Sequence, residues 1–197
     1  KAVIGKDPVI KKVLAALLAK GHILIEDIPG VGKTTLALAF SKTLDLSYRR
    51  MQFTPDVLPT DVVGFTILNG DGEFEYKPGA VLCNLFLADE INRTSSKTQS
   101  ALLEVMEEGK VTVDGVTRPL PAPFMVIATQ NPSGSIGTQM LPESQLDRFM
   151  IRLSMGYPKP EDEIAIMKNR QNSNPLELVQ QLMDTDGILA LQNEVEQ

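Results

Sequence analysis

The sequence has very little of the chemistry that builds disulfide frameworks and thiolate metal clusters. Its 197 residues include one cysteine, Cys83, and one histidine, His22. A single cysteine excludes an intrachain disulfide and a cysteine-rich metal cluster, which fits a protein of a reducing compartment. A single histidine likewise gives no basis for a histidine-built metal site.

Long apolar runs and an excess of basic charge are also missing. No run of about 18 apolar residues could span a bilayer, and the N-terminus lacks the layout of a secretory signal. The formal net charge is -6, which argues against a general nucleic-acid surface because phosphate binding needs clustered Lys and Arg. We expect a cytoplasmic protein without a membrane span. Because Lys1 is not an initiator Met and helical character continues to Gln197, we expect part of a longer protein.

The residues that are present form the pattern of an α/β fold. Helices are predicted over 7–19, 34–44 and 96–108. In the last of these, Ser96 and Gln99 match a capping box. Three short runs are apolar without alternation: 23–25, 85–88 and 125–128. Strands covered on both faces have this pattern, so we predict a parallel sheet between helices.

Two further segments are predicted to be hairpin insertions on this scaffold. The runs 65–68 and 74–76 flank Asn-Gly-Asp-Gly. The runs 111–113 and 116–118 flank Asp-Gly, which is a strong signal for a two-residue hairpin.

A change of character after Tyr157 predicts a domain boundary. The stretch Pro-Lys-Pro that follows reads as a linker, and helical spacing resumes at Leu178, Val179, Leu182 and Met183. We therefore divide the chain into a core, 1–156, and a second piece, 157–197.

A glycine-bearing loop after the first predicted strand has the character of a phosphate site. Residues 23–35 read as a buried strand, a turn and a helix start, which aims backbone N–H groups and the helix N-terminus at an anion. We predict that Lys33 reaches the terminal phosphates of ATP and that the Thr34 hydroxyl ligates Mg²⁺. The residues expected at the nucleotide are Pro29, Gly30, Val31, Gly32, Lys33, Thr34 and Thr35.

Asp27 departs from the general phosphate-loop pattern G-x-x-x-x-G-K-[ST], whose first glycine it replaces. Glycine eases an unusual backbone conformation there, and Asp is one of the few other residues that tolerates positive φ, so we expect the loop to close. The alternative interpretation is an ordinary strand-turn-helix that happens to contain Gly-Lys-Thr.

Two adjacent carboxylates, Asp89 and Glu90, follow the apolar run 85–88. Ligands bind at the carboxyl ends of parallel strands, so we expect both acids beside the phosphate loop. Asp89 is predicted to hold Mg²⁺ through its water shell, and Glu90 to orient and deprotonate the attacking water. The alternative is a solvated acidic turn after a buried strand.

Two further polar residues are candidates with strong local alternatives. Asn131 ends another apolar strand and could contact the γ-phosphate or the lytic water, although Asn-Pro also starts turns. Arg148 follows a short predicted helix and could supply charge to a neighbouring subunit's reaction, as an arginine finger does. Its local alternative is an ion pair with Asp147 or Glu143.

Together these elements resemble the MoxR family of AAA+ ATPases, within the branch that carries a hairpin insert in its second helix. The resemblance covers nearly the whole chain. Its motifs are Val3-Ile4-Gly5, the Glu-Asp-x-Pro-Gly-Val-Gly-Lys-Thr form at 26–34, and the segments 52–56, 88–93, 128–132 and 141–149.

The resemblance implies a P-loop fold with a parallel five-stranded sheet, hairpin insertions and the start of a small helical lid. Residues 1–156 would be the nucleotide-binding core and 157–197 the linker and partial lid. ATP would bind between protomers of a ring, as in a hexamer. Ile4 and Gly5 would border the adenine, Asn131 would be the first sensor, and Arg148 would be the finger acting in trans.

The activity implied is an Mg-dependent ATPase that remodels client proteins, in complex maturation or metal-cofactor insertion. A partner with a von Willebrand factor A domain is implied by the same resemblance. Two alternatives stay open: a nucleotide-gated scaffold with negligible turnover, and a nucleic-acid motor. The acidic charge balance and the lack of a basic-aromatic stretch count against the motor, so nucleic acid is not an expected partner.

Overall fold

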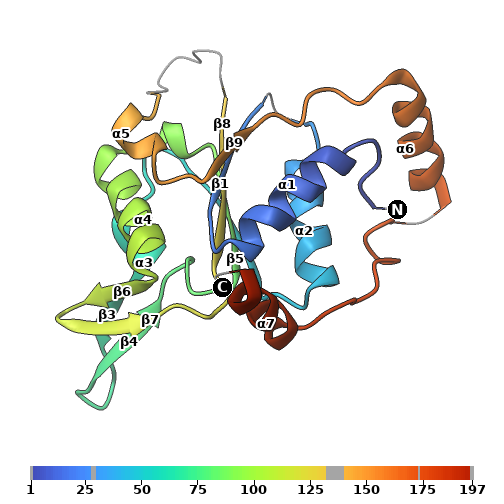
Figure 1. The fold of residues 1–197 in the computed structure, drawn as a ribbon. Helices are drawn as coiled ribbons and strands as arrows, with labels where there is room; N and C mark the ends of the chain where they lie inside the picture. The colour runs from blue at the N-terminus through green and yellow to red at the C-terminus, as the bar shows by residue number, and fades with distance from the viewer. Residues whose placement is uncertain (1, 28–29, 132–139, 173, 196–197) are drawn as a thin grey trace.

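The computed structural model describes residues 2–27, 30–131, 140–172 and 174–195. Its centre is a parallel sheet of five strands in the order β2-β5-β8-β1-β9 (Figure 1). The strands are β1 (Ile23–Glu26), β2 (Tyr48–Gln52), β5 (Leu85–Asp89), β8 (Met125–Gln130) and β9 (Ile151–Leu153). The three continuously apolar runs form the three inner strands, so the predicted five-stranded α/β fold is confirmed.

Helices cover both faces of this sheet (Figure 1). α1 (Asp7–Leu18) and α2 (Lys33–Thr43) pack on one face, while α3 (Pro59–Val63) and α4 (Ser96–Glu108) pack on the other. Along β1, Ile23 and Ile25 belong to the first core and Leu24 to the second. Because both faces are buried, these strands need apolar residues at every position rather than at alternate ones.

The edge strand β2 was not apparent from the apolar pattern. Its sequence is Tyr-Arg-Arg-Met-Gln, in which Arg49, Arg50 and Gln52 are exposed. An edge strand has only one neighbour and tolerates polar side chains, so a search for buried runs misses it. Three short helices complete this half of the fold: α3, the 3-10 helix η1 (Ile91–Arg93) and α5 (Glu143–Leu146).

The N-terminal cap of α4 lies one residue earlier than predicted. Ser95 has extended backbone, and its Oγ accepts a hydrogen bond from the Thr98 N–H at 3.3 Å. Ser96 is already helical and cannot take the cap position, which requires nonhelical backbone. The predicted Ser96–Gln99 capping box is therefore wrong. Gln99 is buried, and its Nε2 donates to the Ile91 carbonyl at 3.1 Å.

Both predicted hairpins are confirmed. β3 (Gly64–Leu68) pairs antiparallel with β4 (Phe74–Pro78), and β6 (Lys110–Val113) with β7 (Val116–Pro119). The two hairpins lie together at the lower left of Figure 1, where the Arg118 guanidinium stacks 3.9 Å from the centre of the Tyr76 ring. Their shared position places them at the opposite end of the sheet from the carboxyl end of β8.

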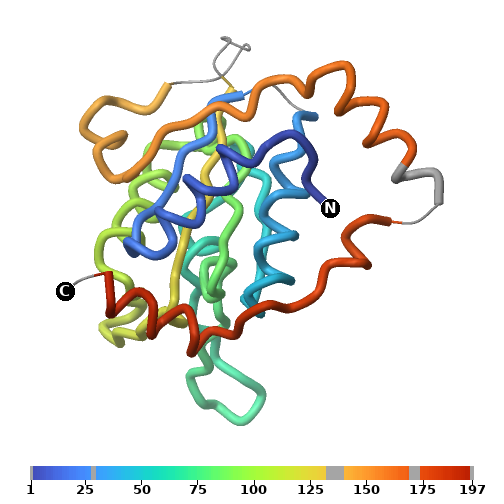
Figure 2. The backbone as a smooth tube through the Cα atoms, turned by 45° about the vertical axis from the view of Figure 1, so that its right-hand side comes forward, coloured from blue at the N-terminus to red at the C-terminus, as the bar shows by residue number. Residues whose placement is uncertain are grey.

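The C-terminal region differs from its prediction. α6 (Pro160–Asn172) begins at the proline assigned to a linker, because proline fits the first turn of a helix. Residues 178–183 are not helical, and the N–H groups of Leu182 and Met183 both donate to the Thr43 carbonyl. Figure 2 shows this segment passing along α2 to α7 (Thr185–Val195), which packs on α1. Within the described ranges, no helix has the length and apolar character needed to cross a membrane.

Candidate functional site

The loop between β1 and α2 has the backbone of an anion site. Gly30 and Gly32 have φ of 90° and 96°, a left-handed region that side chains other than glycine rarely adopt. No side chain caps the start of α2 in the described part of the loop, so the first N–H groups of the helix face outward toward a ligand. Pro29, which we predicted at the nucleotide, lies outside the described residues.

Lys33 is buried at the start of α2, and its Nζ donates to the Asp27 carbonyl oxygen at 2.9 Å. Burial lowers the pKa of its ammonium group, an effect that the carboxylates of Asp89, Asp27 and Glu90 oppose. A phosphate would stabilise this buried cation more than the Asp27 carbonyl does, because the phosphate is charged and the carbonyl is neutral.

Asp27 does not adopt the backbone that we expected of it. The nonglycine residues with positive φ in the described part of the chain are Lys20, Asp45, Glu90 and Asp114, so Asp27 is absent from this group. Its carboxylate instead accepts hydrogen bonds from the Ser154 hydroxyl at 2.9 Å and from the N–H groups of Met155 and Gly156. The side chain that stands in place of glycine thus accepts three hydrogen bonds from residues 154–156.

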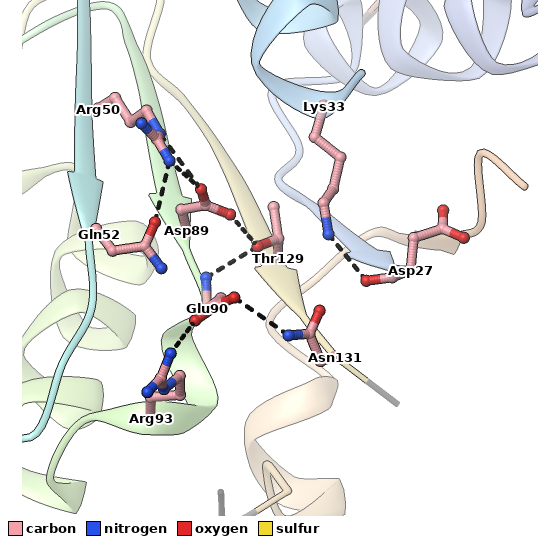
Figure 3. Close-up of polar contacts among 9 residues, drawn as sticks. All are labelled: Asp27, Lys33, Arg50, Gln52, Asp89, Glu90, Arg93, Thr129 and Asn131. Carbon is pink, nitrogen blue, oxygen red and sulfur yellow. Dashed lines mark hydrogen bonds and ion pairs between the residues drawn. The ribbon is translucent and has the colours of Figure 1, made fainter. Parts of the chain in front are cut away.

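Asp89 ends β5 and is held from two sides (Figure 3). Its Oδ1 accepts from the Thr129 hydroxyl at 2.7 Å, and its Oδ2 accepts from the Arg50 guanidinium at 2.6 Å. The same guanidinium donates to Gln52 Oε1 at 3.0 Å. The hydrogen bond to Asp89 is the main reason that the pKa of Arg50 is raised.

Glu90 stands in left-handed backbone, with φ of 56°, directly after β5. Its N–H donates to the Thr129 hydroxyl at 2.9 Å, and its carboxylate accepts from Asn131 at 3.2 Å and Arg93 at 2.7 Å (Figure 3). Strained backbone of this kind at nonglycine residues clusters at functional sites, where surrounding contacts hold it. Two strands, β5 and β8, therefore fix the position of this carboxylate.

A pocket of about 320 Å³ joins these groups. It is lined by Gly30, Gly32, Lys33, Thr34, Thr35, Arg50, Gln52, Asp89 and Glu90. A second pocket of about 390 Å³ shares Gly30, Gly32 and Thr35 with it and extends to Val31 and Ile4. The side chains of Ile166 and Met167 from α6 form its far wall. The two pockets form a polar chamber beside a more apolar one.

Two predicted residues lie apart from these chambers. Gly5 lies next to Ile4 but is not a lining residue, and a Cβ built on it would overlap the Asp162 carboxylate of α6. Arg148 pairs with Glu107 of α4, not with Asp147 or Glu143, and borders a separate surface hollow. The local alternative, an ion pair with Asp147 or Glu143, is therefore wrong, and Arg148 instead pairs with a residue of α4.

Sequence reasoning missed three residues that position the acids: Arg50, Arg93 and Thr129. Arg93 follows Glu90 at a spacing of three, which is a signal for an ion pair across one helical turn. Arg50 and Thr129 gave no comparable signal, because their contacts depend on which strands are neighbours in the sheet.

Comparisons with known proteins agree with this geometry. The model of the ATPase family associated with various cellular activities (AAA) matches residues 22–151. The chain is 51% identical over 197 residues to the uncharacterized protein YeaC of Bacillus subtilis, covering 100% of this chain and 62% of the relative. It is 44% identical over 193 residues to the chaperone MoxR1 of Mycobacterium tuberculosis, covering 98% and 51%.

A solved structure is similar over almost the whole chain. It is a crystal structure from Cytophaga hutchinsonii of a protein provisionally assigned as an ATPase, with a TM-score of 0.90 and 43% identity. The match covers 99% of this chain and 59% of the other. The chain thus spans between half and two thirds of the length of the relatives described here.

Proposed function

This chain belongs to the MoxR family of AAA+ ATPases, and from that premise we propose that it binds MgATP beside the β1–α2 loop and hydrolyses it. The observation that carries the proposal is that Lys33, Asp89 and Glu90 line one pocket at the carboxyl ends of parallel strands. An ordinary strand-turn-helix that contains Gly-Lys-Thr by chance would not be expected to share a pocket with two carboxylates.

The residues present fit a magnesium ion that arrives with the nucleotide. Asp89 and Thr34 both line the polar pocket, and they are the residues that would hold the ion. Mg²⁺ commonly binds one or two protein oxygens together with substrate phosphates. When bound, it supplies neutralising charge at the phosphate oxygens.

Within one protomer, each remaining group has a distinct task. Lys33 exchanges the Asp27 carbonyl for a terminal phosphate oxygen and brings positive charge to it. Glu90 accepts a proton from the attacking water, while the Asn131 amide, which donates to Glu90 in the structure, holds that water toward the γ-phosphate. Arg93, which donates to the Glu90 carboxylate at 2.7 Å, holds that carboxylate in position.

The remaining part of the site comes from a neighbour in our proposal. Arg148 lines neither chamber of its own protomer, which favours a role at the nucleotide of the next subunit in a ring, such as a hexamer. Ile4 and the α6 side chains would receive the adenine in the more apolar chamber.

The biological task that we propose is chaperone-like remodelling of client proteins, in complex maturation or metal-cofactor insertion. The similarity to the chaperone MoxR1 of Mycobacterium tuberculosis supports the general role. A partner with a von Willebrand factor A domain belongs to the same proposal.

The test compares nucleotide binding and turnover in matched variants. Glu90→Gln should keep ATP affinity and lose at least about 100-fold in turnover, the usual contribution of a general base. Lys33→Ala should lose binding itself. The control is Glu108→Gln, a surface acid at the end of α4 that lines neither chamber.

The outcomes separate the proposal from its alternatives. ATP binding with no measurable turnover in the wild-type protein at any concentration would favour a nucleotide-gated scaffold. Unchanged turnover in the Glu90→Gln protein would refute the assignment of Glu90.

A further inference from the structure

The segment 154–157, which joins β9 to α6 and which we call the hinge, is held from two sides. On one side is the carboxylate of Asp27, which accepts from the Ser154 hydroxyl, from the Met155 N–H and, at 3.4 Å, from the Gly156 N–H. Asp27 is only 7% exposed, so its buried carboxylate receives all three of these hydrogen bonds from one short segment. Such satisfaction is what a buried carboxylate requires.

On the other side of the hinge is Lys6, from the chain just before α1. Its Nζ donates to the carbonyl oxygens of Met155 at 2.6 Å, Gly156 at 3.0 Å and Tyr157 at 3.1 Å. The Lys6 ammonium group thus binds three carbonyl oxygens of the hinge, and the Asp27 carboxylate binds two of its N–H groups. Gly156 has φ of 62°, where glycine allows the sharp change of direction toward α6.

Asp27 also contacts the phosphate-binding machinery. Its carbonyl oxygen accepts the Lys33 Nζ at 2.9 Å, so the backbone of one residue holds the phosphate lysine while its side chain holds the hinge. Met155, buried in the core, lies against the same loop near Gly32. A movement of Asp27 cannot leave the hinge unaffected, because its three acceptor contacts would have to stretch or follow.

The hinge in turn sets the position of α6 over the apolar chamber. Pro158 lines that chamber directly after the hinge, and Glu163, Ile166 and Met167 line it from α6. The chamber wall opposite them is the loop itself, at Gly30, Val31 and Gly32. The width of the chamber therefore depends on how the hinge sits relative to the loop.

We propose that Asp27 is a positioning residue that couples the phosphate loop to the α6 lid. This inference rests on the proposed ATP site. The coupling begins when a phosphate draws Lys33 away from the Asp27 carbonyl. Asp27 then shifts, its carboxylate carries the hinge with it, and α6 closes on the base. Hinges of this kind absorb a local change in a few residues at the end of an element.

The test measures hydrogen exchange of the backbone amides in the loop, the hinge and α6, with no nucleotide, with MgADP and with MgATP. Glu90→Gln serves as the background so that ATP persists. In this protein, MgATP is expected to slow exchange in all three segments, and MgADP to slow it less in α6.

Asp27→Gly removes the carboxylate, restores the general loop pattern and keeps the backbone carbonyl for Lys33. We expect the loop to respond to MgATP as before, the hinge and α6 response to fall at least about fivefold, and ATP affinity to weaken about tenfold, within the range of coupling between sites. Asp27→Asn keeps one acceptor oxygen and should give an intermediate response, and it serves as the test if the glycine protein is unstable.

Lys6→Met is the comparison variant: it removes the three hinge contacts that do not come from Asp27, and because Lys6 also lines the apolar chamber, its ATP affinity is measured alongside. Its hinge amides should exchange faster without nucleotide, yet they should still slow when MgATP is added. A full hinge and α6 response in both Asp27 variants would overturn the coupling. By contrast, the ATP site itself would be refuted if MgATP did not slow amide exchange in the loop, or if it still did so in the Lys33→Ala protein. These outcomes differ from those that overturn the coupling alone.

Discussion

Substituting Arg148 by alanine tests whether the site is completed by a neighbouring protomer. In one protomer, Arg148 pairs with Glu107 and borders a hollow that does not include the phosphate loop. Both partners are substantially exposed, at 36% and 65%, and such surface pairs contribute about 0–1 kcal/mol to folding. The Arg148→Ala protein should therefore fold, and a role confined to its own protomer predicts no effect on catalysis.

The trans role predicts a large effect of the same substitution. Arginine fingers contribute a factor of about 10³–10⁵ to turnover, so the Arg148→Ala protein should retain ATP binding and lose at least about 1000-fold in rate. Mixing it with the Glu90→Gln protein should restore activity. One variant supplies intact Glu90 and the other supplies intact Arg148, and in randomly mixed rings about one quarter of sites would combine them.

The assay follows ATP hydrolysis at fixed total protein while the ratio of the two variants is changed. Activity should rise from near zero at either end to a maximum near the equal mixture. Glu107→Gln is the control, because it removes the partner of Arg148 and leaves the guanidinium in place. A mixture no more active than its separate components, or a fully active Arg148→Ala protein, would refute the shared site.

Two further predictions concern the fold. Ser95→Ala should lower the free energy of unfolding by about 1 kcal/mol in urea titrations, whereas Ser96→Ala should change it little, because only Ser95 caps α4. His22 is buried between the Val126 N–H and the Met106 carbonyl, and burial lowers its pKa more than the Met106 contact raises it. The contribution of neutral His22 to the free energy of unfolding should be complete above about pH 6.5. It should be lost as the pH falls below that value, by at most about 1.4 kcal/mol per pH unit. A His22→Gln protein whose stability depends on pH in the same way as wild type would count against this assignment.

The parts of the fold that the sequence predicted are those whose environment is decided locally. β1, β5 and β8 are buried on both faces, so each had to be apolar throughout, and the Asp114-Gly115 turn requires two left-handed residues in a row. β2 depends on a single neighbour, β5, and carries a polar pattern that short loops also have. The helical spacing at 178–183 failed because these residues bind the end of α2 through their backbone.

The candidate site shows the same division. Asp89 and Glu90 could be predicted because they lie at the end of β5, and Lys33 because it begins the helix that follows β1; in both cases chain direction sets the position. Thr129 could not, although its hydroxyl receives the Glu90 N–H and donates to Asp89. That contact requires β8 to lie beside β5, and only the order of strands in the sheet decides it.

The acid at position 27 shows why a pattern search and a physical account can disagree. The general pattern has glycine there because the backbone needs unusual freedom, and from the sequence alone Asp27 is explained as a residue that tolerates positive φ. In the structure Asp27 is not among the residues with positive φ, and its side chain accepts three hydrogen bonds from the hinge. The departure from the pattern thus coincides with a set of side-chain contacts that glycine could not make. In our proposal these contacts tie the loop to α6, so that phosphate binding at the loop changes the position of the lid.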